Sequence, residues 1–126
     1  MVVDDEPTLR RLLGRALERA GFRAETASDG EEALTLIEAA GPSAFRVVLI
    51  DLDLPPRGGA DLFRRLRTAH PDTGVILTSG SAPPAALARE LEESGGIFLA
   101  KPFAPSALVR EIGKLAARHT APVGGP

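Results

Sequence analysis

A run of four aliphatic residues that ends in an aspartate constrains the fold of this chain more than any other feature. Residues 47–50 read Val-Val-Leu-Ile, and such a run with three β-branched members is typical of a strand buried on both faces. Asp51 follows directly, and a loop rich in Pro and Gly leads into a helix predicted from Ala60. Open α/β sheets bind ligands at the carboxyl ends of their strands, so Asp51 is placed either to bind a ligand or to cap the next helix.

Segments with strand and helix patterns alternate along the chain. Strands are predicted at residues 1–3, 22–26, 45–50, 75–77 and 97–100, and helices at 7–20, 31–40, 60–69, 83–94 and 106–118. Strict alternation with short loops predicts an α/β fold, a doubly wound parallel sheet of five strands with five helices on its two faces. The length of 126 residues fits one domain, predicted over 1–118, and residues 119–126 are predicted to be a flexible Pro/Gly tail.

Composition excludes several classes of protein. Without cysteine, the chain can hold neither a disulfide framework nor a cysteine-based zinc site. The net charge of −2 provides no basic surface for direct nucleic-acid binding, and Arg64, Arg65 and Arg67 are interpreted as the solvated face of a helix. No apolar run approaches the roughly 18 residues of a membrane span, and no leader pattern suggests secretion. We therefore expect a cytoplasmic protein that does not bind membranes.

Polar residues gather at the predicted carboxyl ends of four strands. They follow the first, third, fourth and fifth strands, and they are Asp4, Asp5, Asp51, Asp53, Ser79 and Lys101. In a doubly wound sheet these ends converge at one edge. Crowded carboxylates repel one another, which raises their pKa values unless a cation neutralises them, and oxygen ligands without His or Cys suit Mg²⁺. A lysine and a serine beside them supply donors for phosphoryl oxygens, so the cluster has the chemistry of a phosphoryl-transfer site.

Four segments, in order along residues 1–118, resemble the receiver domain of two-component response regulators. They are Val-Val-Asp-Asp-Glu-Pro at 2–7, Ile-Asp-Leu-Asp-Leu-Pro at 50–55 with Gly59, Ile-Leu-Thr-Ser-Gly at 76–80 and Phe-Leu-Ala-Lys-Pro-Phe at 98–103. The resemblance implies a flavodoxin-like fold with strand order 2-1-3-4-5. It also implies a phosphorylation-controlled signalling switch, not an enzyme that turns over a metabolite.

The resemblance implies a role for each acidic residue of the cluster. Asp51 takes the phosphoryl group from the phosphohistidine of a histidine kinase and becomes an acyl phosphate. Mg²⁺ is bound directly by Asp5, mainly through water by Asp4, by a carboxylate oxygen of Asp51 and by the backbone carbonyl of Asp53. The acid at Asp53 stands at the position that tunes dephosphorylation in this family.

The same resemblance assigns the residues that respond to phosphorylation. Ser79 is the switch hydroxyl that moves onto the phosphoryl group, and Phe98 is the switch aromatic that turns inward with it. Lys101 pairs with the phosphoryl group, and the bond between Lys101 and Pro102 is expected to be cis.

The resemblance also implies partners and an output surface. The surface is the predicted helix 83–94, strand 97–100 and helix 106–118, through which a homodimer is possible. The implied partners are a histidine kinase or phosphotransfer protein, and a downstream protein or an output domain that this sequence lacks. The short first strand and the Pro- and Gly-rich end favour a fragment of a longer regulator over a stand-alone protein.

Two other functions compete with the receiver hypothesis. In a haloacid-dehalogenase-like phosphatase, Asp51 and Asp53 would follow a buried strand, with a Ser or Thr and a Lys at later strand ends. Against it, Leu54 stands where that family favours Thr or Val, the acidic pair precedes the nucleophile, and no cap insertion encloses a substrate. A degenerate receiver that only mediates contacts is disfavoured because every type of site residue is present.

Overall fold

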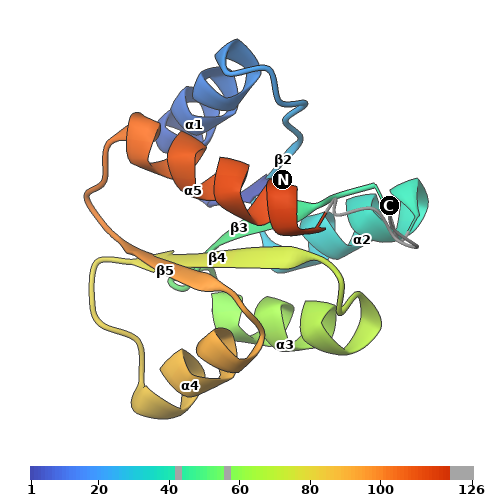
Figure 1. The fold of residues 1–126 in the computed structure, drawn as a ribbon, viewed down its shortest axis with the longest axis vertical. Coiled ribbons are helices and arrows are strands. Elements are labelled where there is room, and N and C mark those ends of the chain that lie inside the picture. Colours follow the sequence, from blue (N-terminus) through green and yellow to red (C-terminus); the bar gives the residue numbers. More distant parts are fainter. Residues whose placement is uncertain (42–43, 56–57, 120–126) are drawn as a thin grey trace.

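The described residues form five strands that alternate with five helices. The computed structural model describes residues 1–41, 44–55 and 58–119 (Figure 1). The elements, in chain order, are β1 (Val2–Val3), α1 (Pro7–Arg19), β2 (Thr26–Ala27), α2 (Gly30–Ala40), β3 (Val47–Asp51), α3 (Gly59–Ala69), β4 (Gly74–Ser79), α4 (Ala85–Glu93), β5 (Ile97–Ala100) and α5 (Pro105–His119). All neighbouring strands are parallel, and their order is β2-β1-β3-β4-β5. The predicted fold class and strand order are confirmed.

Helices cover both faces of the sheet, and each face has its own apolar cluster (Figure 1). One cluster joins helices α2, α3 and α4 to the sheet, and its helical members are Ala33, Ile37, Leu62, Phe63, Leu66, Leu87 and Leu91. The other joins α1 and α5 to the sheet, through Leu13, Leu17, Leu108, Ile112 and Leu115. Alternate residues of β3 enter opposite clusters, because successive strand side chains point to opposite faces. The strand at 47–50 is therefore buried on both faces, as predicted.

The start of helix α1 positions the acidic pair that follows β1. Pro7 occupies the first turn, where its missing N–H group leaves no hydrogen bond unmade. The carboxylate of Glu6 caps the helix by accepting from the backbone N–H groups of Thr8 and Leu9, at 3.1 and 2.7 Å. The chain thus turns immediately after β1, so Asp4 and Asp5 remain at the carboxyl edge of the sheet.

The second strand differs from its prediction. Strand β2 covers Thr26–Ala27 and not residues 22–26, because only Val2 and Val3 of β1 are available to pair with it. Phe22 and Ala24 are nevertheless half-buried against the cluster of α1 and α5. In the predicted strand, Phe22, Ala24 and Thr26 alternate with Arg23 and Glu25. This alternation agrees with the burial of Phe22 and Ala24 but not with Thr26, which is exposed, while Ala27 beyond it is buried.

Two further details concern the helices at the ends of the chain. Leu12 belongs to the apolar repeat predicted for the first helix, yet its side chain is 50% exposed, while Leu13 is buried. His119, predicted to begin the tail, is the last residue of α5, and the rest of that predicted tail (120–126) lies outside the described residues. Among the helices that the structure describes, none is long and apolar enough to cross a membrane.

Candidate functional site

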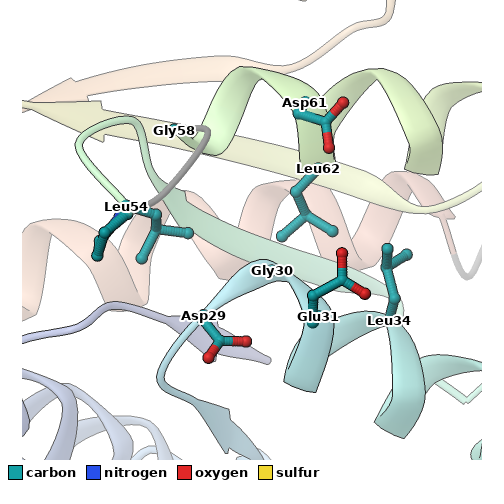
Figure 2. A pocket seen from close by; sticks show the side chains of 9 residues that line it. Asp29, Gly30, Glu31, Leu34, Leu54, Gly58, Asp61 and Leu62 are labelled. Atoms are coloured by element: carbon teal, nitrogen blue, oxygen red, sulfur yellow. The ribbon is translucent and has the colours of Figure 1, made fainter.

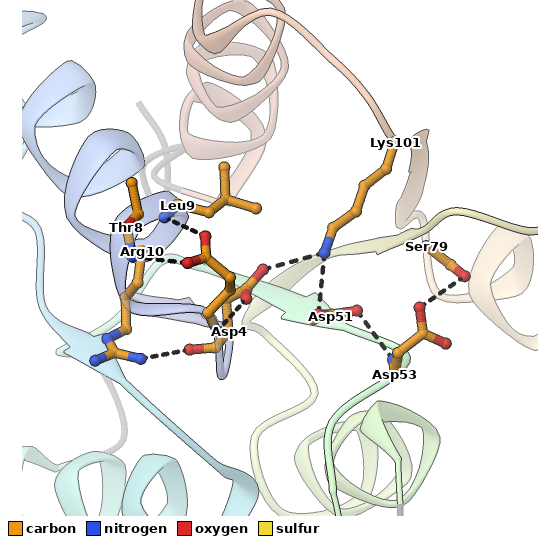
Figure 3. A network of polar contacts seen from close by, with 9 residues as sticks. Asp4, Thr8, Leu9, Arg10, Asp51, Asp53, Ser79 and Lys101 are labelled. Carbon is orange, nitrogen blue, oxygen red and sulfur yellow. Dashed lines mark hydrogen bonds and ion pairs between the residues drawn. The ribbon is translucent and has the colours of Figure 1, made fainter.

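The site is built around Asp51, the last residue of the central strand β3. Its side chain is buried, as is that of Asp4 at the end of the neighbouring strand β1. The ammonium group of Lys101, which follows β5, lies between them, with Nζ at 3.0 Å from Oδ2 of Asp51 and 3.3 Å from Oδ2 of Asp4 (Figure 3). Three strand ends therefore supply one cluster of two buried carboxylates and a half-buried cation.

Backbone contacts hold Asp4 in place. Its Oδ1 accepts from the backbone N–H of Glu6 at 2.9 Å, and its carbonyl oxygen accepts from Nη1 of Arg10 at 2.8 Å (Figure 3). Burial raises the pKa of Asp4 above its ordinary value, although the Glu6 hydrogen bond and Lys101 oppose that shift. The buried carboxylate is thus in a setting that favours additional positive charge.

The same cluster keeps the ammonium group of Lys101 positively charged. Burial by itself lowers the pKa of its ammonium group, but the hydrogen bond and charge of Asp51, together with Asp4, outweigh burial and raise the pKa above its ordinary value. Lys101 therefore stays protonated at neutral pH and remains available to an anionic group bound beside Asp51.

Asp5 completes a set of oxygen ligands. One carboxylate oxygen from each of Asp4, Asp5 and Asp51 lies within 4.8 Å of the others, and Asp5 is exposed while the other two are buried. An all-carboxylate set with one open side suits a hard cation that keeps several waters, which is the preference of Mg²⁺. The donor set thus fits the predicted metal.

The loop after β3 folds back onto the site. The backbone N–H of Asp53 donates to Oδ1 of Asp51 at 2.9 Å, and the backbone N–H of Gly59 donates to the carbonyl of Leu52 at 3.0 Å. At Gly59 a Cβ atom would collide with the carbonyl oxygen of Asp51 and would lie 2.6 Å from Cγ2 of Ile50. Helix α3 can therefore begin this close to Asp51 only because residue 59 is glycine.

The predicted switch hydroxyl reaches the site through Asp53. Ser79, buried at the end of β4, donates from Oγ to Oδ2 of Asp53 at 3.3 Å (Figure 3). The same Oγ accepts from the backbone N–H of Ser81 at 3.1 Å. The sequence placed Ser79 and Asp53 at the same edge of the sheet, but reasoning from the sequence missed their side-chain contact, because the two residues lie 26 positions apart.

The remaining predicted residues lie on and after β5. Phe98 pairs in register with Leu77 and is half-buried against the cluster of α2, α3 and α4. The bond between Lys101 and Pro102 is cis, as predicted. The backbone N–H of Lys101 donates to the carbonyl of Ser79 at 2.9 Å, which ties the ends of β4 and β5 together.

A cavity of about 230 Å³ lies beside the site, between the start of α2, the start of α3 and the loop after β3 (Figure 2). Leu34, Leu54 and Leu62 form much of its wall, with carboxylates such as Asp29 and Asp61 at its rim. Asp51 and Lys101 are not among its lining residues. The acidic cluster is therefore at the edge of the sheet and not in this cavity.

The sequence is similar to a known family over nearly the whole chain. Residues 1–113 match the family model described as the response regulator receiver domain. The transcriptional regulatory protein SrrA of Staphylococcus aureus is 32% identical over 118 residues, which are 94% of this chain and 47% of SrrA. The chain thus spans about half the length of that relative.

The fold is similar to solved receiver domains. The receiver domain of the Francisella response regulator 1452 is 30% identical with a TM-score of 0.79, over 93% of this chain and 94% of that one. A response regulator receiver domain protein from Clostridium thermocellum is 26% identical with a TM-score of 0.84, over 94% of each chain. The comparisons give no support to the phosphatase alternative.

Proposed function

The chain belongs to the response regulator receiver domain family, and from this premise we propose that Asp51 is the residue that accepts the phosphoryl group. One observation carries the proposal. The buried carboxylate of Asp51 is paired with Lys101 and adjoins the carboxylates of Asp4 and Asp5, so a buried carboxylate, a cation and a cluster of acidic oxygens meet at one sheet edge. The protein is accordingly a signalling domain, and it is proposed not to turn over a metabolite.

In the proposed reaction a carboxylate oxygen of Asp51 attacks the phosphorus of a phosphohistidine on a histidine kinase or phosphotransfer protein. An O–P bond forms as the P–N bond breaks, the electron pair of that bond stays on the imidazole, and the imidazole takes a proton from solvent. Lys101 pairs with the oxygens of the transferred group, which its place beside Oδ2 of Asp51 supports. The Ser79 hydroxyl donates to another of those oxygens once it has turned toward Asp51.

The proposed cofactor is Mg²⁺, which when bound neutralises charge between the carboxylates and the phosphoryl group. Asp5 and one oxygen of Asp51 are proposed as direct ligands, Asp4 as a ligand mainly through water, and Asp53 as a ligand through its backbone carbonyl. The clustering of the Asp4, Asp5 and Asp51 oxygens within 4.8 Å supports this set.

The output surface is proposed to consist of α4, β5 and α5. Phe98 on β5 is proposed as the switch aromatic, which its half-buried place supports, because a side chain between core and solvent can change position without breaking the core. This surface is also the one proposed to contact a downstream protein, an output domain or a second copy of the chain. The domain is proposed to act in the cytoplasm.

Direct binding of nucleic acid is not part of the proposal. The basic side chains of α3 are paired with acids of neighbouring helices. Arg64 forms two hydrogen bonds with Glu90, at 2.9 and 3.0 Å, and Arg67 lies 3.7 Å from Glu93. These pairs support the interpretation of the arginines as a solvated helix face.

The test is phosphorylation by acetyl phosphate with Mg²⁺, followed by intact mass. We expect a single added phosphoryl group in the wild type and none in Asp51→Asn or in wild type with EDTA. Asp72→Asn is the matched control, because Asp72 is an exposed aspartate in the loop before β4. An adduct that persists in Asp51→Asn would contradict the proposed acceptor, and rapid release of phosphate from a phosphomonoester would favour a phosphatase.

A further inference from the structure

The side chain of Asp53 contacts the switch hydroxyl and has no role in the reaction proposed above. Ser79 Oγ donates to Asp53 Oδ2 at 3.3 Å, and among the described residues no other acceptor takes this proton (Figure 3). Ser79 is 4% exposed, whereas Asp53 is exposed. The contact therefore joins a buried hydroxyl to a carboxylate at the surface of the site.

A serine hydroxyl has a single proton to donate. In the structure that proton goes to Asp53, while the acceptor side of the hydroxyl is used by the backbone N–H of Ser81 at 3.1 Å. Donation to a phosphoryl oxygen on Asp51 therefore requires that the bond to Asp53 be broken. A carboxylate competes well for this proton, because hydrogen bonds to ionised acceptors are stronger than those to neutral ones.

Asp53 also forms a hydrogen bond with Asp51, the residue proposed to be phosphorylated. Its backbone N–H donates to Oδ1 of Asp51 at 2.9 Å, so one residue contacts both the proposed acceptor and the switch hydroxyl. Conversion of the Asp51 carboxylate to an acyl phosphate removes the carboxylate charge, which weakens that backbone hydrogen bond. The residue that holds Ser79 is thus loosened by the same event that offers Ser79 a new acceptor.

We infer that the Asp53 side chain is a positioning residue that holds the Ser79 hydroxyl away from the phosphoryl site until Asp51 is phosphorylated. The inference rests on the proposed function of Asp51 and adds a second role for Asp53, beside the metal contact proposed for its backbone carbonyl. Asp53 thereby opposes the phosphorylated form, and its removal favours that form.

The test is a double-mutant cycle between Asp53→Ala and Ser79→Ala. Phosphorylation rates with acetyl phosphate are followed by intact mass, at a Mg²⁺ concentration that saturates each variant. Loss of the Asp53 charge speeds reaction with an anionic donor in either background. Asp53→Ala also releases the Ser79 hydroxyl, and this release should raise the phosphorylation rate by roughly a further fivefold, but only in the background that keeps Ser79. A fivefold change in rate corresponds to about one net hydrogen bond. Asp53→Asn, which keeps a weaker, uncharged oxygen acceptor, should show a smaller Ser79-dependent gain than Asp53→Ala.

A second measurement does not require phosphorylation. The backbone amide of Ser81 donates to Ser79 Oγ, so its ¹H–¹⁵N resonance in the unphosphorylated protein reports the position of the hydroxyl. We expect this resonance to shift in Asp53→Ala and to shift less in Asp53→Asn, which keeps an uncharged acceptor.

The outcomes separate the inference from the proposed function. If the wild type forms no adduct, the proposed function of Asp51 fails, and the Ser81 resonance still decides whether Asp53 holds the hydroxyl. If the adduct forms but Asp53→Ala accelerates the reaction equally with and without the Ser79 hydroxyl, the inference is overturned. A Ser81 resonance that is unchanged in Asp53→Ala overturns it as well.

Discussion

The Nζ atom of Lys101 lies 3.0 Å from Oδ2 of Asp51, although the two residues are 50 positions apart in the sequence. The same ammonium group lies 3.3 Å from Oδ2 of Asp4. One cation therefore stabilises two buried carboxylates, and the stability of the unphosphorylated protein should depend on it.

Replacement of Lys101 by Met should lower the free energy of unfolding by about 2 kcal/mol in EDTA, because two buried carboxylates lose their cation. Added Mg²⁺ should then stabilise the variant more than the wild type, since the metal replaces the lost charge. Urea unfolding followed by circular dichroism measures both effects. The control is Lys114→Met, the only other lysine, which is exposed and lies 3.5 Å from Glu111 on the same helix. Equal losses in the two variants would show that the Lys101 cluster contributes nothing specific.

Replacement of Asp4 by Asn should stabilise the protein in EDTA by an amount of the order of 1 kcal/mol and weaken Mg²⁺ binding. Burial raises the pKa of Asp4, so the folded state binds its proton more tightly than the unfolded state. The free energy of unfolding of the wild type, relative to that of Asp4→Asn, should therefore fall as pH rises from 3.8, the ordinary pKa of an aspartate, through the raised pKa of Asp4 in the folded state. Urea titrations across this range, with calorimetry for Mg²⁺, provide the measurement. If the stability advantage of Asp4→Asn over the wild type narrowed as pH rises, the raised pKa of Asp4 would be contradicted.

Replacement of Gly59 by Ala should destabilise the protein by about 2 kcal/mol, because the new methyl group collides with the Asp51 carbonyl and Ile50. The rate of Asp51 phosphorylation should fall further than stability alone explains, since relief of the clash moves the end of β3. Gly113→Ala is the matched control, because nothing lies within 4 Å of a Cβ at Gly113 and alanine favours helix. That variant should be as stable as the wild type or more so, as thermal unfolding would show.

Replacement of Leu13 by Ala should cost about 3 kcal/mol, whereas Leu12→Ala should change stability by less than about 0.5 kcal/mol. The two leucines are neighbours on α1, but Leu13 is 1% exposed and Leu12 is 50% exposed. Chemical unfolding of both variants checks this difference. A large loss in Leu12→Ala would mean that another surface covers that side chain in solution.

Much of the fold can be predicted from the sequence, because the spacing of apolar residues indicates which side chains are buried. The apolar run at 47–50 and the alternation of strand and helix patterns predict five parallel strands and the sheet edge where polar residues meet. The strand order came from the resemblance to receiver domains. The pattern failed at 22–26, where the half-buried Phe22 and Ala24 lie outside the strand. Alternation there agrees with the burial of Phe22 and Ala24 but not with the exposed Thr26, and strand pairing also requires a partner strand of matching length.

The sequence by itself also determined the kinds of residue at the site, because Asp, Ser and Lys at successive strand ends carry their chemistry in their side chains. Only the tertiary structure decided their pairing. It placed Lys101 between Asp4 and Asp51 and directed the Ser79 hydroxyl to Asp53. These contacts join residues from different strands, and their distances depend on sheet register, on the close approach permitted by Gly59 and on the fold of the loop after β3. Local sequence patterns do not encode such long-range distances, because they arise only when the two layers of helices pack the strands together.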